Sequence, residues 1–228
     1  WSPSWIFNIN LIILMKKTIS ILGSTGSIGL TTFKILNKKK NNFQFNLLSA
    51  NKNFKLICKQ IKIYKPKFFV INDEIIFKKV LKKFKKSNTK ILNSFEKINT
   101  KKNSHITISA IPGIAGLKPT IFMTKKSNKI LIANKESIIC GWDLIKKSAI
   151  KNNTKIIPID SEHFSILNLI KNHDIEEIKK IYITASGGPF LNFKKKQLKK
   201  IKPNDALKHP KWKMGKKISI DSSTLMNK

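Results

Sequence analysis

Three consecutive polar residues have the types and spacing of a metal site. The segment DSE at residues 160–162 places two carboxylates on either side of one serine, in a chain with only 12 acidic residues. Carboxylate oxygens are the ligands that Mg²⁺ and Mn²⁺ prefer in proteins. We therefore expect Asp160 and Glu162 to bind a divalent cation. Capping of a following helix by Asp160 or Ser161 is the alternative, and His163 is expected to pack or cap rather than bind metal.

A glycine-rich segment has the pattern of a dinucleotide-binding turn. GSTGSIG, at residues 23–29, follows an apolar run and precedes a stretch of helical pattern. In that position, a tight turn and a helix N-terminus offer backbone N–H groups to a pyrophosphate. The spacing is G-x-x-G-x-x-G rather than G-x-G-x-x-G, so an ordinary glycine-rich turn is the alternative.

The end of the second predicted strand bears on cofactor choice. NAD-specific domains place an acidic residue there for the ribose hydroxyls. Here the segment is ANKN at residues 50–53, which has no acid and one cation. The sequence therefore favours NADP, with Lys52 facing the 2′-phosphate. One more surface lysine in a lysine-rich chain is the alternative.

Further polar groups lie after a predicted strand and near the end of the chain. NKE at residues 134–136 follows the fifth predicted strand, at the edge where open α/β sheets bind ligands. Lys135 is therefore a candidate ligand-binding residue. A solvated surface lysine is the alternative. SGGP at residues 186–189 and SST at residues 222–224, with Asn227 and Lys228, supply hydroxyls, an amide and a cation suited to a phosphate monoester. Each alone is typical of turns and caps.

The segment HPKWKMG at residues 209–215 has the composition of a lid that closes over a substrate. Its histidine, tryptophan and methionine lie among glycine and proline residues. A plain surface loop is the alternative.

The elements that must position these groups alternate between strands and helices. Strands are predicted at residues 18–22, 43–49, 68–71, 106–108, 130–132 and 156–159. Helices are predicted at residues 27–36, 54–64, 74–84, 117–124 and 136–150. Strands separated by helices of this length predict a parallel sheet with right-handed crossovers. Residues 15–159 are thus expected to form a doubly wound, Rossmann-like α/β domain.

The pattern changes after residue 159. A helix is predicted at residues 164–170, and strands are predicted at residues 181–184 and 218–220. We expect residues 160–228 to form an incomplete α+β catalytic domain, because the chain stops without a helix stop signal. Residues 1–14 lack the basic start and cleavage site of a signal peptide, so we interpret them as upstream sequence before an initiator Met15. No apolar run approaches the roughly 18 residues that span a membrane.

The composition is strongly basic, yet it does not favour a polyanion partner. Lys and Arg total 46 against 12 Asp and Glu, for a formal net charge of +34, and all 46 are lysine. Proteins that grip phosphates or base edges usually employ Arg. The lysines accompany abundant Asn and Ile, which is typical of drift toward A- and T-rich codons. We expect neither a nucleic-acid nor a membrane partner, and the widely spaced Cys58 and Cys140 indicate free thiols of a reducing, cytoplasmic compartment.

Taken together, five ordered segments resemble the 1-deoxy-D-xylulose 5-phosphate reductoisomerase family. They are the segments GSTGSIG, ANKES, PIDSEH, SGGPF, and HP through MNK, and the resemblance covers residues 15–228. It implies the isomerisation of 1-deoxy-D-xylulose 5-phosphate and its reduction to 2-C-methyl-D-erythritol 4-phosphate. The implied cofactors are NADPH and a divalent cation, Mg²⁺ or Mn²⁺, and the implied substrate is a phosphorylated small molecule.

The resemblance also implies roles for individual residues. The implied cofactor contacts are Thr25, Gly26, Ser27, Ile28, Asn51, Lys52, Asn53, Asn134, Glu136 and Gly215. The implied metal ligands are Asp160 and Glu162. The implied substrate contacts are Lys135, Ser161, Glu162, Ser186, His209, Ser222, Asn227 and Lys228, with Trp212 and Met214 in the lid. The implied catalytic residues are Lys135, Asp160, Glu162 and His209. Asn51 stands where the family often has Gly. Asn tolerates the left-handed backbone conformation that Gly adopts readily, so this departure is compatible with the family pattern.

One departure from the family pattern leaves a second hypothesis open. In the family, a third metal carboxylate follows shortly after the position of Lys228, and further domains and a homodimer-forming sheet come later. The leading hypothesis is the N-terminal part of a working enzyme that is a homodimer when complete. The alternative is an inactive, truncated gene fragment that retains at most NADPH binding, and a basic nucleic-acid-binding module is a third hypothesis.

Overall fold

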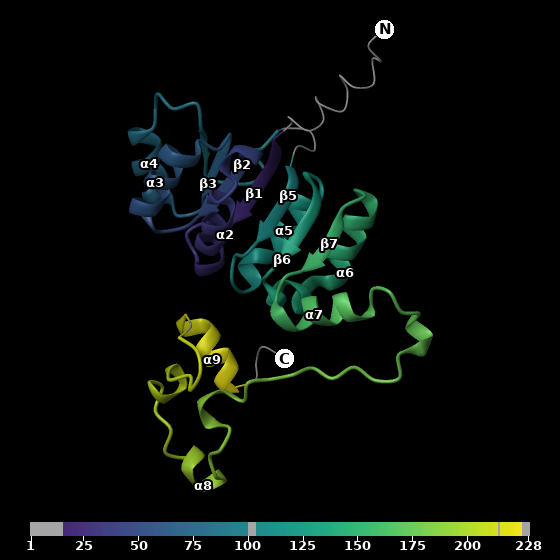
Figure 1. Cartoon of the computed structure of the whole chain (residues 1–228). Coiled ribbons are helices and arrows are strands. Elements are labelled where there is room, and N and C mark those ends of the chain that lie inside the picture. Colours follow the sequence, from purple (N-terminus) through teal and green to yellow (C-terminus); the bar gives the residue numbers. More distant parts are fainter. Residues whose placement is uncertain (1–15, 100–103, 214, 225–228) are drawn as a thin grey trace. The chain divides into compact units, whose positions relative to one another are not determined.

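The computed structural model describes residues 16–99, 104–213 and 215–224, in two units. The first unit ends at Ile159 and the second begins at Asp160 (Figure 1). The interpretation of residues 1–14 and Met15, and the roles expected of Met214, Asn227 and Lys228, concern positions outside the described residues.

The described part of the first unit forms a seven-stranded sheet in the order β4-β3-β2-β1-β5-β6-β7, with every neighbouring pair parallel. The strands are β1 (Lys17–Leu22), β2 (Phe43–Ala50), β3 (Phe68–Ile71), β4 (Lys90–Leu92), β5 (Ser104–Ser109), β6 (Ser127–Ile132) and β7 (Lys155–Pro158). The helices are α2 (Ser27–Asn37), α3 (Phe54–Tyr64), α4 (Glu74–Lys83), α5 (Leu117–Thr124) and α6 (Lys135–Lys151). This arrangement confirms the predicted doubly wound, Rossmann-like sheet.

The chain reverses its direction of growth at β1, which lies between β2 and β5. At such a switch point, the loops leaving neighbouring strands diverge and open a crevice at the carboxyl edge of the sheet. The segments after β1, β2, β5 and β6 all begin at this edge. The fold therefore brings the glycine turn, residues 50–53 and residues 134–136 to one side of the sheet.

The sheet packs a separate apolar layer on each face. Because successive side chains of a strand point to opposite faces, Ile21 and Leu22 belong to different core clusters. Ile21 packs in the cluster that contains Phe33 of α2 and Ile57 of α3, whereas Leu22 packs with Met123 of α5. Each of these five side chains is at most 4% exposed, so β1 is held rigidly between two layers of helices.

Strand β4 was not predicted from the sequence. It has three residues, of which Ile91 is buried, and it pairs with β3 at the edge of the sheet. One buried side chain gives no periodicity that could distinguish a strand from a loop.

The second unit contains helices and 3₁₀ turns, and its described residues form no strand. Its helices are α7 (Ser161–Ile170), α8 (Lys195–Leu198) and α9 (Lys216–Thr224), and its 3₁₀ turns are Ile175–Glu177, Gly188–Phe190 and Asp205–Leu207.

Both strands predicted in the second unit are wrong. Residues 181–184 have strand-forming side chains, but no described strand pairs with them, and a strand needs the hydrogen bonds of a neighbour. Residues 218–220 lie inside α9. The helix is favoured there by an ion pair between Lys217 Nζ and Asp221 Oδ2 at 2.6 Å, one turn apart.

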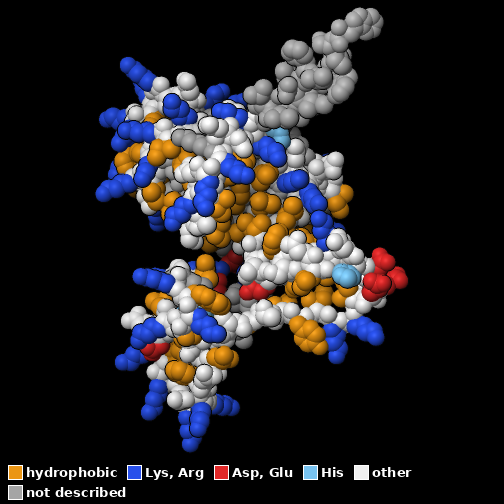
Figure 2. Space-filling view, viewed as in Figure 1, with side chains coloured by type: hydrophobic (Ala, Val, Ile, Leu, Met, Phe, Trp, Pro, Cys, Tyr) orange, Lys and Arg blue, Asp and Glu red, His pale blue; other side chains and the backbone are white. Residues whose placement is uncertain are grey.

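Lysine side chains project from the surface of the molecule (Figure 2). All lysines whose exposure is described are exposed except Lys126 and Lys135, which are half-buried. Within the described ranges, no helix has the length and apolar character needed to cross a membrane.

Candidate functional site

The glycine-rich turn lies directly after β1, at the switch point of the sheet. Gly26 is the N-cap of α2 and has no side-chain cap, and both Gly26 and Ser27 are exposed. The first turn of α2 contains no acidic residue. An uncapped helix N-terminus with no nearby carboxylate attracts an anion, so Thr25, Gly26, Ser27 and Ile28 fit the pyrophosphate of a dinucleotide.

The turn is packed tightly beneath its exposed surface. A Cβ atom at Gly29 would lie 2.6 Å from the carbonyl oxygens of both Gly23 and Ser24. Glycine at this position therefore lets the first turn of α2 lie directly on the loop that precedes it. The close approach fixes where the helix begins relative to β1.

The segment after β2 presents no carboxylate to the sheet edge. Asn51 and Lys52 are exposed, and Asn53 caps α3 by accepting a hydrogen bond from the Leu56 N–H to its Oδ1 at 3.1 Å. A segment with a cation and no acidic residue suits the 2′-phosphate of NADP better than the free ribose hydroxyls of NAD. The side chain of Asn53 is already engaged in capping.

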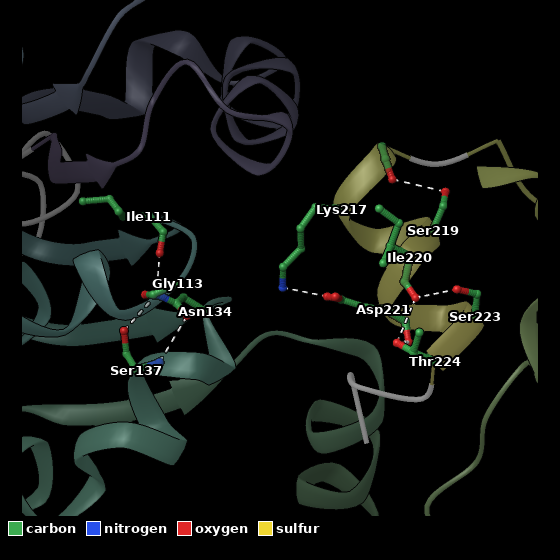
Figure 3. A network of polar contacts seen from close by, with 11 residues as sticks. Ile111, Gly113, Asn134, Ser137, Lys217, Ser219, Ile220, Asp221, Ser223 and Thr224 are labelled. Carbon is green, nitrogen blue, oxygen red and sulfur yellow. Dashed lines mark hydrogen bonds and ion pairs between the residues drawn. The ribbon is translucent and has the colours of Figure 1, made fainter. Parts of the chain in front are cut away.

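Asn134 joins two loops at the carboxyl edge (Figure 3). It is 4% exposed and caps α6, with Oδ1 accepting from the Ser137 N–H at 3.2 Å. Its Nδ2 donates to the carbonyl oxygens of Ile111 and Gly113, the latter at 2.9 Å. Its side chain is therefore a structural tie between the loops after β5 and β6. The half-buried Lys135 and Glu136 begin α6 beside it.

The predicted metal ligands begin the second unit. Asp160 caps α7, as the alternative interpretation expected, and its Oδ2 accepts from the His163 N–H at 3.3 Å. The same oxygen lies 2.5 Å from His163 Nδ1, so the ring orients the carboxylate. Ser161 Oγ donates to Glu162 Oε2 at 2.9 Å.

These groups fit a hard divalent cation in part. Mg²⁺ is typically held by one or two carboxylates, with water and substrate oxygens completing the shell, and Asp160 with Glu162 supplies that number. Among the described residues, no group of three His, Cys, Asp or Glu side chains lies close enough together to hold a metal ion.

Three predicted substrate residues from distant parts of the sequence meet in the second unit. Ser186 Oγ lies 2.8 Å from Ser222 Oγ and 3.1 Å from His209 Nε2. Ser222 belongs to α9 and is 5% exposed. A Cβ atom at Gly188 would lie 2.8 Å from the Ser222 carbonyl oxygen, so the turn after Ser186 packs against the α9 backbone.

The hydrogen bonds of His209 define its tautomer. Nδ1 accepts from the backbone N–H groups of Lys211 and Trp212 at 3.2 and 3.1 Å. The proton of the neutral ring is therefore assigned to Nε2, which donates to Ser186 Oγ. The ring also stacks on Trp212, with centroids 4.9 Å apart. The three groups thus form one hydrogen-bonded chain, whose hydroxyls and imidazole N–H are of the types that bind an anionic oxygen.

Two supporting residues were not found from the sequence. The Ser49 carbonyl accepts from the Ser24 N–H at 2.8 Å, and buried Gln60 of α3 contacts Ser24 from below the turn. Neither residue belongs to a recognisable motif. Gly215 immediately precedes α9, and its carbonyl oxygen accepts hydrogen bonds from the N–H and the hydroxyl of Ser219.

The sheet order and the glycine turn define a Rossmann-like α/β protein. Two family models match the chain: 1-deoxy-D-xylulose 5-phosphate reductoisomerase over residues 19–141, and the C-terminal domain of that enzyme over residues 156–228. The chain therefore belongs to the 1-deoxy-D-xylulose 5-phosphate reductoisomerase family.

Individual relatives agree with this assignment. The reductoisomerase of Pelagibacter ubique is 48% identical over 218 residues, covering 94% of this chain and 56% of the relative. That of Wolbachia pipientis is 45% identical over 217 residues, covering 94% and 55%. This chain thus spans about half the length of the curated relatives it matches.

Solved structures of the family share the fold. A reductoisomerase in complex with NADPH, fosmidomycin and magnesium is 33% identical, with a TM-score of 0.81, covering 92% of this chain and 55% of that structure. The enzyme from Zymomonas mobilis in complex with NADPH is 30% identical, with a TM-score of 0.80, covering 93% and 55%.

Proposed function

We propose that this chain supplies the cofactor site and part of the substrate site of an NADP-dependent reductoisomerase. The reaction is the isomerisation and reduction of 1-deoxy-D-xylulose 5-phosphate to 2-C-methyl-D-erythritol 4-phosphate. The observation that carries the proposal is the meeting of Ser186, His209 and Ser222 in one hydrogen-bonded set. His209 and Ser222 lie 23 and 36 positions from Ser186 in the sequence, yet both are within hydrogen-bond distance of its hydroxyl.

In this proposal, residues 15–159 bind NADPH. Thr25, Gly26, Ser27 and Ile28 hold the pyrophosphate, and Asn51 and Lys52 lie near the 2′-phosphate. The support is the uncapped N-terminus of α2 and the exposed cation after β2. Because the side chains of Asn53 and Asn134 are engaged in capping, we propose that they shape the edge, with Glu136 and Gly215 completing the cofactor contacts.

Residues 160–228 contribute to the metal and substrate sites. Asp160 and Glu162 ligate a divalent cation, and Ser161 contacts the substrate. Lys135, which precedes this segment, contacts a substrate hydroxyl group. The substrate and its phosphate are bound by Ser186, His209, Ser222, Asn227 and Lys228. Trp212 and Met214 cover the substrate and the nicotinamide. When bound, the cation supplies Lewis acidity toward the substrate oxygens and NADPH supplies hydride.

Location and assembly belong to the same proposal. Cys58 and Cys140 are free thiols, which fits the reducing cytoplasm. A homodimer of the complete protein is proposed on the family resemblance alone.

The first test is a fluorescence titration of the chain with NADPH and with NADH. We expect NADPH to bind about fivefold more tightly, the effect of roughly 1 kcal/mol from one exposed ion pair. Lys52→Ala should abolish this preference, whereas Lys55→Ala, an exposed lysine on the adjacent helix α3, should retain it. Equal affinities for the two cofactors, or no binding of either, would contradict the cofactor assignment.

A second arm of the experiment addresses the phosphate set. Fosmidomycin, a phosphonate present in the solved relative, serves as the probe with Mg²⁺ and NADPH. Ser186→Ala should weaken fosmidomycin binding without changing the NADPH affinity. The matched control is Ser223→Ala, since the Ser223 hydroxyl donates to the Ile220 carbonyl within α9. Equal fosmidomycin affinities for both variants would count against the assignment.

A further inference from the structure

We propose that Gln60 is a positioning residue for the cofactor turn: it locks the peptide between Ser24 and Thr25 so that the Thr25 N–H faces the pyrophosphate. The inference rests on the proposed NADPH function. Gln60 lies on α3, is 4% exposed and is 36 residues from Ser24. It lies in none of the five motif segments GSTGSIG, ANKES, PIDSEH, SGGPF and HP through MNK.

The contact is a reciprocal pair of hydrogen bonds. Ser24 Oγ donates to Gln60 Oε1 at 2.7 Å, and Gln60 Nε2 donates to the Ser24 carbonyl oxygen at 2.9 Å. The Ser24 N–H donates to the Ser49 carbonyl at 2.8 Å. Every polar atom of Ser24 is therefore bound inside the protein, and Ser24 itself is fully buried.

The orientation of one peptide group follows from these contacts. In a trans peptide, the carbonyl of one residue and the N–H of the next point in opposite directions. With the Ser24 carbonyl directed at the buried Gln60 amide, the Thr25 N–H points away from it. The half-exposed Thr25 and exposed Gly26 follow on that side.

The alternative peptide orientation would oppose binding. If the Ser24–Thr25 peptide flipped, it would present a carbonyl oxygen to the negatively charged pyrophosphate in place of an N–H donor. Gln60 therefore acts on cofactor binding without contacting the cofactor. It selects the binding-competent state of the turn before the cofactor arrives.

The size of the effect follows from the population of that state. Apparent affinity falls in proportion to the competent fraction. If the turn without Gln60 keeps its shape about a tenth of the time, the Kd for NADPH rises about tenfold.

The test compares Gln60→Met, which removes both hydrogen bonds at similar side-chain length, with Ile61→Val on the same helix. Ile61 is 2% exposed and packs in the core, so its variant loosens α3 packing without touching the turn. NADPH and adenosine 2′-monophosphate, which lacks the pyrophosphate, are each titrated against the 228-residue chain. Urea unfolding is measured for both variants.

We expect Gln60→Met to raise the Kd for NADPH about tenfold and to leave that for adenosine 2′-monophosphate within about twofold. Ile61→Val should change neither affinity while lowering the urea midpoint. Equal losses for both ligands, or an unchanged NADPH affinity in Gln60→Met, would overturn the positioning role. If Gln60→Met does not fold, Ser24→Ala, which removes one of the two bonds, must show the same selective loss for NADPH. A wild-type chain that binds no NADPH would instead refute the proposed function itself.

Discussion

Adding a methyl group at Gly29 should push α2 away from the glycine-rich turn. The new Cβ would lie 2.6 Å from two backbone carbonyl oxygens, whereas ordinary contact begins at 3.4 Å. The two surfaces must therefore separate by several tenths of an ångström. Both are backbone, so no flexible side chain can move aside.

The magnitude is the balance of two opposing effects. Overpacking of this kind costs about 1–3 kcal/mol, and replacing Gly by Ala inside a helix returns up to about 1 kcal/mol. We expect Gly29→Ala to lower the free energy of unfolding by about 1–2 kcal/mol. For a urea m-value of about 2 kcal/mol/M, the midpoint would fall by roughly 0.5–1 M.

Urea denaturation followed by far-UV circular dichroism provides the assay, with NADPH titration as a second readout. Gly215→Ala is the stability control, because its added Cβ would meet nothing within 4 Å and its unfolding midpoint should stay unchanged. A Gly29→Ala protein that is as stable as the wild type would refute the reasoning. It would mean that the turn accommodates a methyl group and that helix propensity alone determines the change in the free energy of unfolding.

Two further predictions concern titratable groups. Burial raises the pKa of the Cys58 thiol, whereas Cys140 is exposed. A thiol reagent at pH 8 should therefore label Cys140 rapidly and Cys58 only as fast as the protein opens. Equal labelling rates for the two cysteines in the folded protein would contradict this prediction. The Lys118 ammonium, with help from the Ser94 hydroxyl, lowers the pKa of Glu96 to about 2. Because this lies below the ordinary value of 4.5, the stabilisation is complete above pH 4.5 and is lost as pH falls toward 2. Exposure limits it to less than about 1 kcal/mol, measurable as a gap in unfolding free energy between wild type and Glu96→Gln at pH 6 that narrows below pH 4.5 and closes only as the pH approaches 2.

The elements that the sequence predicts well are those whose burial leaves a clear pattern of apolar residues, either a continuous run or a repeat on one face. In β3, residues 68–71 are apolar throughout because both faces are covered, and the predicted bounds are those observed. Helix α3 was likewise predicted with its observed bounds, since its apolar side chains recur on one face and Asn53 supplies the cap. Local pattern and tertiary packing agree in these elements.

Predictions of secondary structure failed where contacts with other residues, rather than the local sequence pattern, determine the conformation. Residues 181–184 have the composition of a strand, yet composition cannot state whether another strand pairs with them. Residues 218–220 alternate like a strand over three positions only, and an ion pair one turn apart favours a helix. Strand β4 has too few residues to show a period.

The candidate site was found from motifs, whereas its supports were not. The glycine turn and the carboxylates of residues 160–162 have spacings that carry chemical meaning. The contacts of Gln60 with Ser24, and of Asn134 with Gly113, join residues more than 20 positions apart through single amide groups. An isolated glutamine on an amphipathic helix gives no signal of such a role.

The surface lysines have a practical consequence. Because all 46 basic residues are lysine, every permanent positive charge on a side chain is carried by a primary amine. A single amine-acetylating reagent can therefore report on every accessible cationic side chain other than histidine in one mass-spectrometric experiment. Lys135 is half-buried at the start of α6, just after the carboxyl end of β6. A ligand at that edge of the sheet should slow the acetylation of Lys135. The exposed lysines serve as internal standards in the same experiment.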